Sequence, residues 1–150
     1  MRLPSALIFL GILAPIGGVP ADTADYWRCV DGEWIAQGRP GHPRPNKSCG
    51  WHPRIPQRME ECVQQGGAWG PVGIFPMPVC RLQTNDAGNP CADGDECESA
   101  CIAELDQTEL TILKGGKLLR KLGRCAPTSM VVGCHAFVVA GEITGITCLD

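Results

Sequence analysis

The stretch Asp86–Cys101, which reads DAGNPCADGDECESAC, places three of the chain's ten cysteines around a helix-start signal. Asp93 is the predicted N-cap, because its carboxylate can accept hydrogen bonds from N–H groups that have no partner at a helix start. Glu96, three residues later, completes a predicted capping box. The pattern therefore predicts a short helix from about Gly94 to Glu104.

Two cysteines of this stretch, Cys97 and Cys101, stand four residues apart and would share one face of that helix. A rigid helix seldom brings neighbouring sulfurs into bonding geometry, so we expect each to pair with a different segment. An even number of cysteines in an exported chain rich in Gly and Pro is typical of a disulfide framework. Five bridges are predicted, with a pairing that the spacing does not determine, among Cys29, Cys49, Cys62, Cys80, Cys91, Cys97, Cys101, Cys125, Cys134 and Cys148.

The first 21 residues have the pattern of a secretory signal peptide. Arg2 supplies the positive charge, an apolar run follows from Ala6 to about Ile16, and small residues lead to a predicted cleavage after Ala21. This apolar run is too short to span a bilayer, and no later stretch of the chain is apolar enough. We therefore predict an exported protein without an integral membrane segment, located in the periplasm or outside the cell.

Charge and motif content narrow the functional classes. The chain has 13 basic and 16 acidic residues and a formal net charge of −3. Nucleic acid is not an expected partner, because no basic stripe is large enough to displace counterions from phosphates. No cofactor is predicted. Zinc is not predicted either, because cysteine pairs with zinc-site spacing are missing and an oxidising compartment favours disulfides.

After the signal peptide the chain divides into two regions. Residues 22–55 form a Pro/Gly-rich N-terminal segment, here called the flap, and residues 56–150 form a predicted disulfide-stapled domain. The dense prolines from Pro40 to Pro56 exclude helix and interior strand, so this stretch should lie extended over the surface. A bridge between Cys29 and Cys49 would pin it near the core.

Within residues 56–150 the sequence predicts an α+β domain with two short helices on a short antiparallel sheet. Besides Gly94–Glu104, a helix is expected over Pro56–Gln65, with proline in its first turn and glycines at its end. A Gly-Gly turn within residues 111–119 predicts a projecting hairpin. Strands are expected over Cys134–Ala140 and Ile143–Leu149, with their two cysteines tying this second hairpin to the helices.

Two groups of side chains form a possible interaction surface. The aromatic residues of the flap would make an interface patch if they lie together, or would pack the flap onto the core. The basic residues of the predicted hairpin would contact an anionic partner, or would simply be solvated. The residues of these two groups are Trp27, Trp34, Trp51, Lys114, Lys117, Arg120 and Lys121.

Two further kinds of site were weighed. Calcium could use the oxygens of Asp86, Asp93, Asp95 and Glu96, but their spacing differs from an EF-hand loop and helix capping accounts for the cluster. Serine, histidine and acidic residues are present, yet no serine has the surroundings of a nucleophile. No catalytic residue is therefore predicted, and a cavity that brings His135 beside an acid would favour an enzyme.

The spacing of cysteines and glycines from Cys62 to Asp150 resembles a group of small exported cysteine-rich bacterial proteins of unknown function. The shared features are a GG-x-W segment at Gly66–Trp69, a DAGK-P-C-like segment at Asp86–Cys91, and a C-terminal hairpin that starts at Gly133-Cys134. The chain departs from this group in the flap and in a longer segment over 105–122. The resemblance implies no activity, because none is assigned to the group.

Taken together, these patterns predict an exported, disulfide-stabilised protein that is more likely to bind than to catalyse. The first hypothesis is a non-enzymatic interaction or inhibitor module with an unknown protein or surface glycan as partner, because loops on a rigid scaffold suit recognition. The alternative hypothesis is a small exported hydrolase or metal-dependent enzyme, whose histidine and carboxylates converge only in the folded chain.

Overall fold

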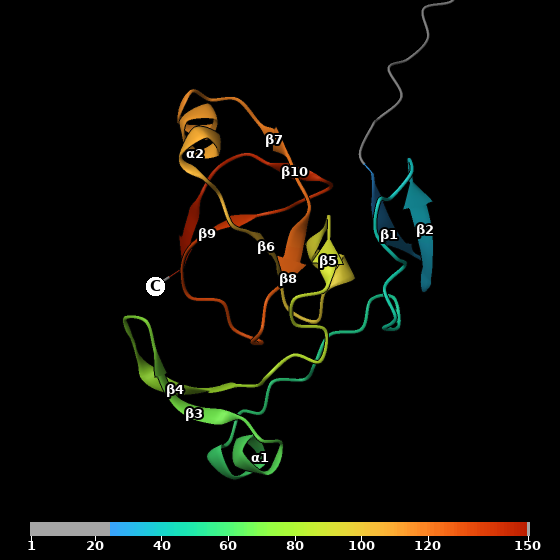
Figure 1. Ribbon diagram of the computed structural model, residues 1–150. Helices are drawn as coiled ribbons and strands as arrows, with labels where there is room; N and C mark the ends of the chain where they lie inside the picture. The colour runs from blue at the N-terminus through green and yellow to red at the C-terminus, as the bar shows by residue number, and fades with distance from the viewer. Residues whose placement is uncertain (1–24, 150) are drawn as a thin grey trace, which may run out of the picture.

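The computed structural model describes residues 25–149, so the predicted signal peptide lies outside the described residues. Small antiparallel sheets and two short α-helices make up this part of the chain (Figure 1). The elements are β1 (Tyr26–Val30), β2 (Glu33–Gln37), α1 (Met59–Gln64), β3 (Ala68–Val72), β4 (Phe75–Arg81), β5 (Pro90–Cys91), the 3₁₀ turn η1 (Gly94–Glu96), β6 (Cys101–Ala103), α2 (Gln107–Lys114), β7 (Leu119–Arg120), β8 (Gly123–Cys125), β9 (Gly133–Phe137), β10 (Glu142–Ile143) and β11 (Thr147–Leu149).

The largest sheet has five strands in the order β11-β9-β6-β8-β5, with antiparallel neighbours. The main hydrophobic core lies against it, and four of its seven buried residues are cysteines. These seven are Cys91, Cys97, Cys101, Cys125, Ala136, Val138 and Ile143. Such a core buries little apolar area, and covalent cross-links therefore supply a large share of the stability.

A second, smaller core joins α1 to the β3–β4 hairpin, at the opposite end of the molecule from α2 (Figure 1). It is built from the Cys62–Cys80 disulfide and Leu82, with Trp69 packed against it. Gly67 has to be glycine here, because a Cβ at this position would lie 2.7 Å from Cys62 Sγ and 2.9 Å from Cys80 Sγ. This close approach is a physical reason for the second glycine of the GG-x-W segment.

All ten cysteines form disulfides, as predicted. Cys97 and Cys101 pair with different segments, which confirms that expectation, and Cys29 bonds to Cys49 within the flap. The prediction for the C-terminal cysteines is wrong: Cys134 and Cys148 bond to each other across β9 and β11 and do not reach a helix. The pairs are Cys29–Cys49, Cys62–Cys80, Cys91–Cys101, Cys97–Cys125 and Cys134–Cys148.

The predicted helix over Gly94–Glu104 is wrong beyond its first turn. Asp93 does cap that turn, accepting the Asp95 N–H at 2.9 Å. The Glu96 side chain, however, does not return to the cap but binds the flap and the Ala92 N–H. The chain becomes extended at Cys97 and enters β6, where sheet hydrogen bonds and two disulfides replace helical ones.

The second α-helix lies where a hairpin was predicted. Asp106 and Glu109 form a complete capping box at the start of α2, with side-chain to backbone distances of 2.8 and 2.9 Å. This capping box starts a helix in the segment where the Gly-Gly turn predicted a hairpin. Gly115 and Gly116 end the helix, so the turn is confirmed but the strand before it is not.

α1 confirms the other predicted helix over a shorter range, and the α+β class stands.

The C-terminal hairpin is partly confirmed. β9 and the turn at Ala140-Gly141 lie where predicted, and both turn residues have positive φ (49° and 78°). The predicted return strand is divided in two, because β10 pairs with β7 whereas β11 pairs with β9. The segment from Glu142 to Leu149 therefore contributes one short strand to each of two sheets.

Candidate functional site

A large open cleft lies between the end of the flap, α1, and the segment that follows β4. Its volume is about 810 Å³, and it is here called the Trp51 cleft. This size is in the range of about 300–1,000 Å³ that ligand sites usually have. Its walls are Trp51, Pro53, Arg54, Ile55, Pro56, Gln57, Arg58, Glu61, Gln64, Gln65, Leu82, Gln83, Asn85 and Glu98.

Hydrogen bonds fix the main chain of Trp51, which lines this cleft. The Trp51 N–H donates to the Ser48 carbonyl at 3.0 Å, and the Trp51 carbonyl accepts Lys47 Nζ at 3.1 Å. The residue nevertheless keeps 45 % of its surface exposed. A fixed backbone with an exposed aromatic ring is a suitable contact for a ligand, because little conformational freedom is lost on binding.

At the inner side of the cleft Glu98 is buried and its orientation is fixed. Its carboxylate accepts the Asn85 N–H at 2.9 Å and the Asn85 side-chain amide at 3.2 Å. Behind it, Asp86 accepts the Glu98 N–H at 2.6 Å, while the other Asp86 oxygen is buried without a hydrogen-bond partner. Burial raises the pKa of Asp86, and the nearby negative charge of Glu98 adds to this effect.

A buried polar contact attaches the flap to the rest of the molecule. Glu96 accepts the Trp27 N–H at 2.6 Å with one oxygen, and with the other it meets His42 Nε2 at 2.7 Å and the Ala92 N–H at 2.8 Å. Both partners of the His42–Glu96 ion pair have only 1 % of their side chains exposed. Nδ1 of His42 is buried without a partner.

Lys47 is the second flap residue that reaches the body of the protein. Its Nζ donates to the Cys97 carbonyl as well as to that of Trp51. Burial lowers the pKa of Lys47, although the charges of Asp86, Asp95 and Glu98 act in the opposite direction. Lys47 therefore links the flap to the main chain at Cys97, just before β6, and to the main chain of Trp51 in the cleft.

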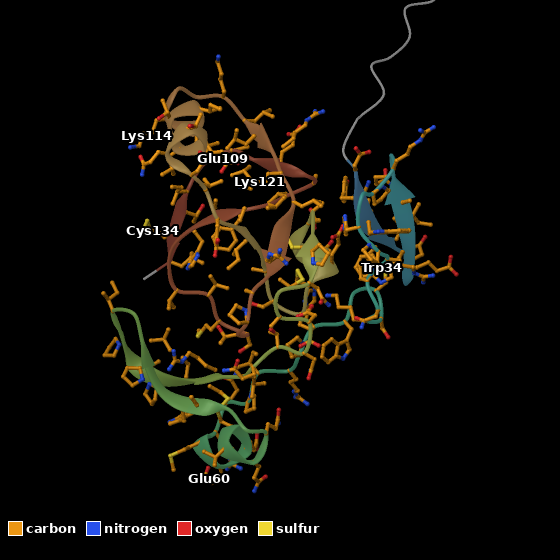
Figure 2. The ribbon with its side chains drawn as sticks, viewed as in Figure 1. Trp34, Glu60, Glu109, Lys114, Lys121 and Cys134 are labelled. Carbon is orange, nitrogen blue, oxygen red and sulfur yellow. A yellow bond between two sulfur atoms is a disulfide. The ribbon has the colours of Figure 1, made fainter. Side chains whose placement is uncertain are left out.

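The flap aromatics do not form one patch. Trp34 is buried and donates its indole N–H to the Lys47 carbonyl at 3.0 Å, beside the β1–β2 hairpin and away from α1 (Figure 2). Trp27 is half-buried and donates its indole N–H to the His42 carbonyl at 3.2 Å. Of the three tryptophans proposed for an interaction surface, Trp51 is the one that lines the large cleft.

The four basic residues of the proposed surface lie at and after the end of α2 (Figure 2). Lys114 and Lys117 are exposed. Arg120 Nη2 is paired with Glu142 at 2.9 Å, and Lys121 Nζ with Glu109 at 2.8 Å. Because acids already accompany two of the four charges, the attraction of this region for an anionic partner is weak.

His135 lines a different cavity, of about 650 Å³, together with Glu104, Lys121 and Arg124. Its Nε2 faces the Val132 carbonyl at 2.8 Å, so this nitrogen carries the proton and Nδ1 is left as the basic one. This is the juxtaposition of histidine and acid that would favour an enzyme. No serine, threonine or free cysteine lines the cavity, so any hydrolysis there would have to use water as nucleophile.

Asp93 and Glu96, two of the four carboxylates considered for calcium, make hydrogen bonds within the described residues. The Asp93 carboxylate accepts the Asp95 and Ala140 N–H groups, and Glu96 accepts from the flap and Ala92. Close cysteine clusters exist at Cys91, Cys97 and Cys101, but disulfide sulfurs are not thiolates and do not offer the ligands that zinc takes.

Sequence reasoning missed an apolar groove of about 670 Å³ between β4, the 130–132 segment and β11. Met77 and Leu149 lie in its walls with 73 % and 43 % of their surface exposed. The β3–β4 hairpin has a register shift between Gly70 and Val72, and nothing in its local sequence showed that β11 would lie near it. We call this feature the Met77 groove.

The architecture defines a small disulfide-rich α+β protein in which no described helix is long and apolar enough to cross a membrane. Comparisons with protein-family models, with curated proteins and with solved structures find no match to the chain. The resemblance to small exported bacterial proteins therefore stays a prediction. Five disulfides are consistent with an oxidising compartment.

Proposed function

We propose that the protein is an exported, non-enzymatic interaction module that binds its partner at the Trp51 cleft. The observation that supports this most is a large open cleft lined by a half-exposed tryptophan whose main chain is fixed by hydrogen bonds. Disulfides on either side hold the surrounding segments, so the site is largely preformed. Preformed sites lose less free energy to ordering when a ligand binds.

A small exported hydrolase is the second candidate, and the cavity shared by His135 and Glu104 supports it. An unprotonated Nδ1 beside a carboxylate could act as a general base toward water. The two hypotheses use separate cavities, because the Trp51 cleft and the His135 cavity have no lining residue in common. Substitutions in one cavity therefore test one hypothesis without disturbing the other.

The test is sedimentation of the fluorescently labelled, disulfide-bonded protein with the cell envelope of the organism that produces it. We expect stable binding that Trp51→Ala weakens and His135→Ala leaves unchanged, with no soluble product released over hours. Release of soluble fragments that is lost in both His135→Ala and Glu104→Gln would overturn the binding module in favour of a hydrolase. Envelope binding that is unchanged in the Trp51→Ala variant would also overturn the proposed binding module.

A further inference from the structure

We infer that the Trp51 cleft binds a neutral oligosaccharide, an inference that rests on the proposed function and names its ligand class. The charges of the cleft are balanced, with Arg54 and Arg58 against Glu61 and Glu98. Arg58 and Glu61 are themselves 3.9 Å apart at the exposed rim. A phosphate-, sulfate- or uronate-bearing ligand would therefore gain no net attraction, and neither would a cation.

Primary amides dominate the polar lining. Four of the six glutamines of the chain and one asparagine line the cleft, and they are Gln57, Gln64, Gln65, Gln83 and Asn85. A carboxamide donates and accepts hydrogen bonds at the same time, and so does a sugar hydroxyl. Gln57 and Asn85 already donate to the Ile55 carbonyl and to Glu98. The amides of Gln64, Gln65 and Gln83 can therefore meet the sugar hydroxyls in either orientation, beside charges that balance one another.

The Trp51 indole supplies the apolar contact that a pyranose ring requires. A sugar ring has hydroxyls around its edge and C–H groups on its faces, and an aromatic ring packs on such a face while its neighbours reach the edge. Trp51, Gln64 and Gln65 line the same cleft of about 810 Å³, which is large enough to hold more than one sugar unit. Pro53 and Pro56 fix the backbone between them.

The Met77 groove shows how different a site for an apolar ligand is. Its walls are Val72, Met77, Val79, Met130, Val131, Val132, Cys148 and Leu149, without a single amide or charged side chain. A protein segment with apolar side chains would bind there rather than in the amide-lined cleft. The two sites therefore separate a glycan partner from a protein partner experimentally.

The experiment uses a microarray of defined neutral and anionic oligosaccharides, probed with the intact disulfide-bonded protein. We expect binding to neutral chains, weakened about tenfold by Trp51→Ala and only partly by Trp51→Phe, which keeps an aromatic face. Gln64→Ala and Gln83→Ala should also weaken binding. Gln107→Ala is the matched control, because this exposed glutamine lies on α2, outside the cleft lining. Unchanged thermal melting shows that each variant is folded.

Binding confined to sulfated or uronate-bearing chains, or neutral-chain binding that the cleft variants leave unchanged, would overturn the inference. So would the absence of any bound glycan. Treating the cell envelope separates this failure from that of the proposed function. If protease abolishes Trp51-dependent envelope binding and periodate does not, the partner is a protein, the glycan inference falls and the binding module remains. If periodate abolishes it and protease does not, both stand.

Discussion

The flap and the body of the molecule are held together by different means. Four of the five disulfides lie within residues 62–148, whereas the fifth joins Cys29 to Cys49 and closes the flap on itself. No disulfide among these ten cysteines crosses from flap to body. The flap is attached through polar contacts to Glu96 and Cys97. A disulfide restricts the unfolded chain, whereas a buried polar contact fails when one partner is removed.

The largest expected effect comes from breaking the flap contact at Glu96. Glu96→Ala leaves His42 buried without its acid and removes the acceptor of the Trp27 and Ala92 N–H groups. Leaving a buried hydrogen-bond donor without an acceptor costs about 1–3 kcal/mol, and three donors lose their acceptor here. We expect flap amides to lose hydrogen-exchange protection while the five-stranded sheet keeps it. Glu60→Ala, at an exposed acid of α1, is the control (Figure 2); equal protection in both variants would contradict the prediction.

Removing one disulfide at a time, by replacing both of its cysteines, tests the same difference between flap and body. The double variant Cys91→Ser with Cys101→Ser takes a bridge out of the main core and should lower the free energy of unfolding by about 2–5 kcal/mol. The double variant Cys29→Ser with Cys49→Ser should loosen the flap and leave the denaturation midpoint of the body nearly unchanged. Urea denaturation followed by NMR of both regions checks this, and a common loss of stability in the two regions would show that they are one cooperative unit.

Glycine substitutions probe packing in the two regions. A Cβ at Gly123 would lie 2.7 Å from Cys101 Sγ and 2.7 Å from the Ile102 carbonyl oxygen. Gly123→Ala should therefore destabilise the body by about 1–3 kcal/mol. Gly41→Ala in the flap is the matched control, since nothing lies within 4 Å of its Cβ, and thermal denaturation should show little change. Similar melting of both variants would contradict the close packing around Gly123.

The smallest effect concerns the pH dependence set by Asp86. Burial raises the pKa of Asp86, so the folded state favours the protonated form and the ionised form costs stability as pH rises through that pKa. Asp86→Asn keeps an acceptor for the Glu98 N–H and removes the charge. We expect the variant to be more stable than the natural chain at neutral pH, with the difference shrinking below the ordinary pKa of aspartate. Denaturation at pH 3 and pH 7 checks it; a difference that grows on acidification would contradict it.

Local chemistry made several features predictable. Asp93 caps a turn, Gly66 and Gly67 follow a helix, and Gly141 forms a turn with positive φ, because each depends on atoms only a few residues away. The Asp106 capping box was equally local and was missed, because the prediction for this segment rested on the Gly115-Gly116 turn alone. Gly94–Glu104 failed for another reason: the Glu96 side chain binds a flap residue 69 positions earlier.

The candidate site was far less predictable than the fold class. Trp51 was predicted to be part of a possible interaction surface, but Gln64, Gln83 and Glu98 come from three separate segments and carry no motif. Their convergence depends on the Cys62–Cys80 bridge and on the path of the chain after β4. His135 and Glu104 meet only because β6 and β9 are neighbours in the sheet.

By itself the sequence determined a small cysteine-rich α+β protein with five disulfides, because cysteine number, glycine turns and short helix signals are properties of the chain and its near neighbours. The tertiary structure decided which cysteines pair, where the second helix lies, and which side chains share the Trp51 cleft. These depend on distances through space between segments far apart in the chain. Spacing along a sequence does not encode such distances until the strands are paired and the disulfides closed.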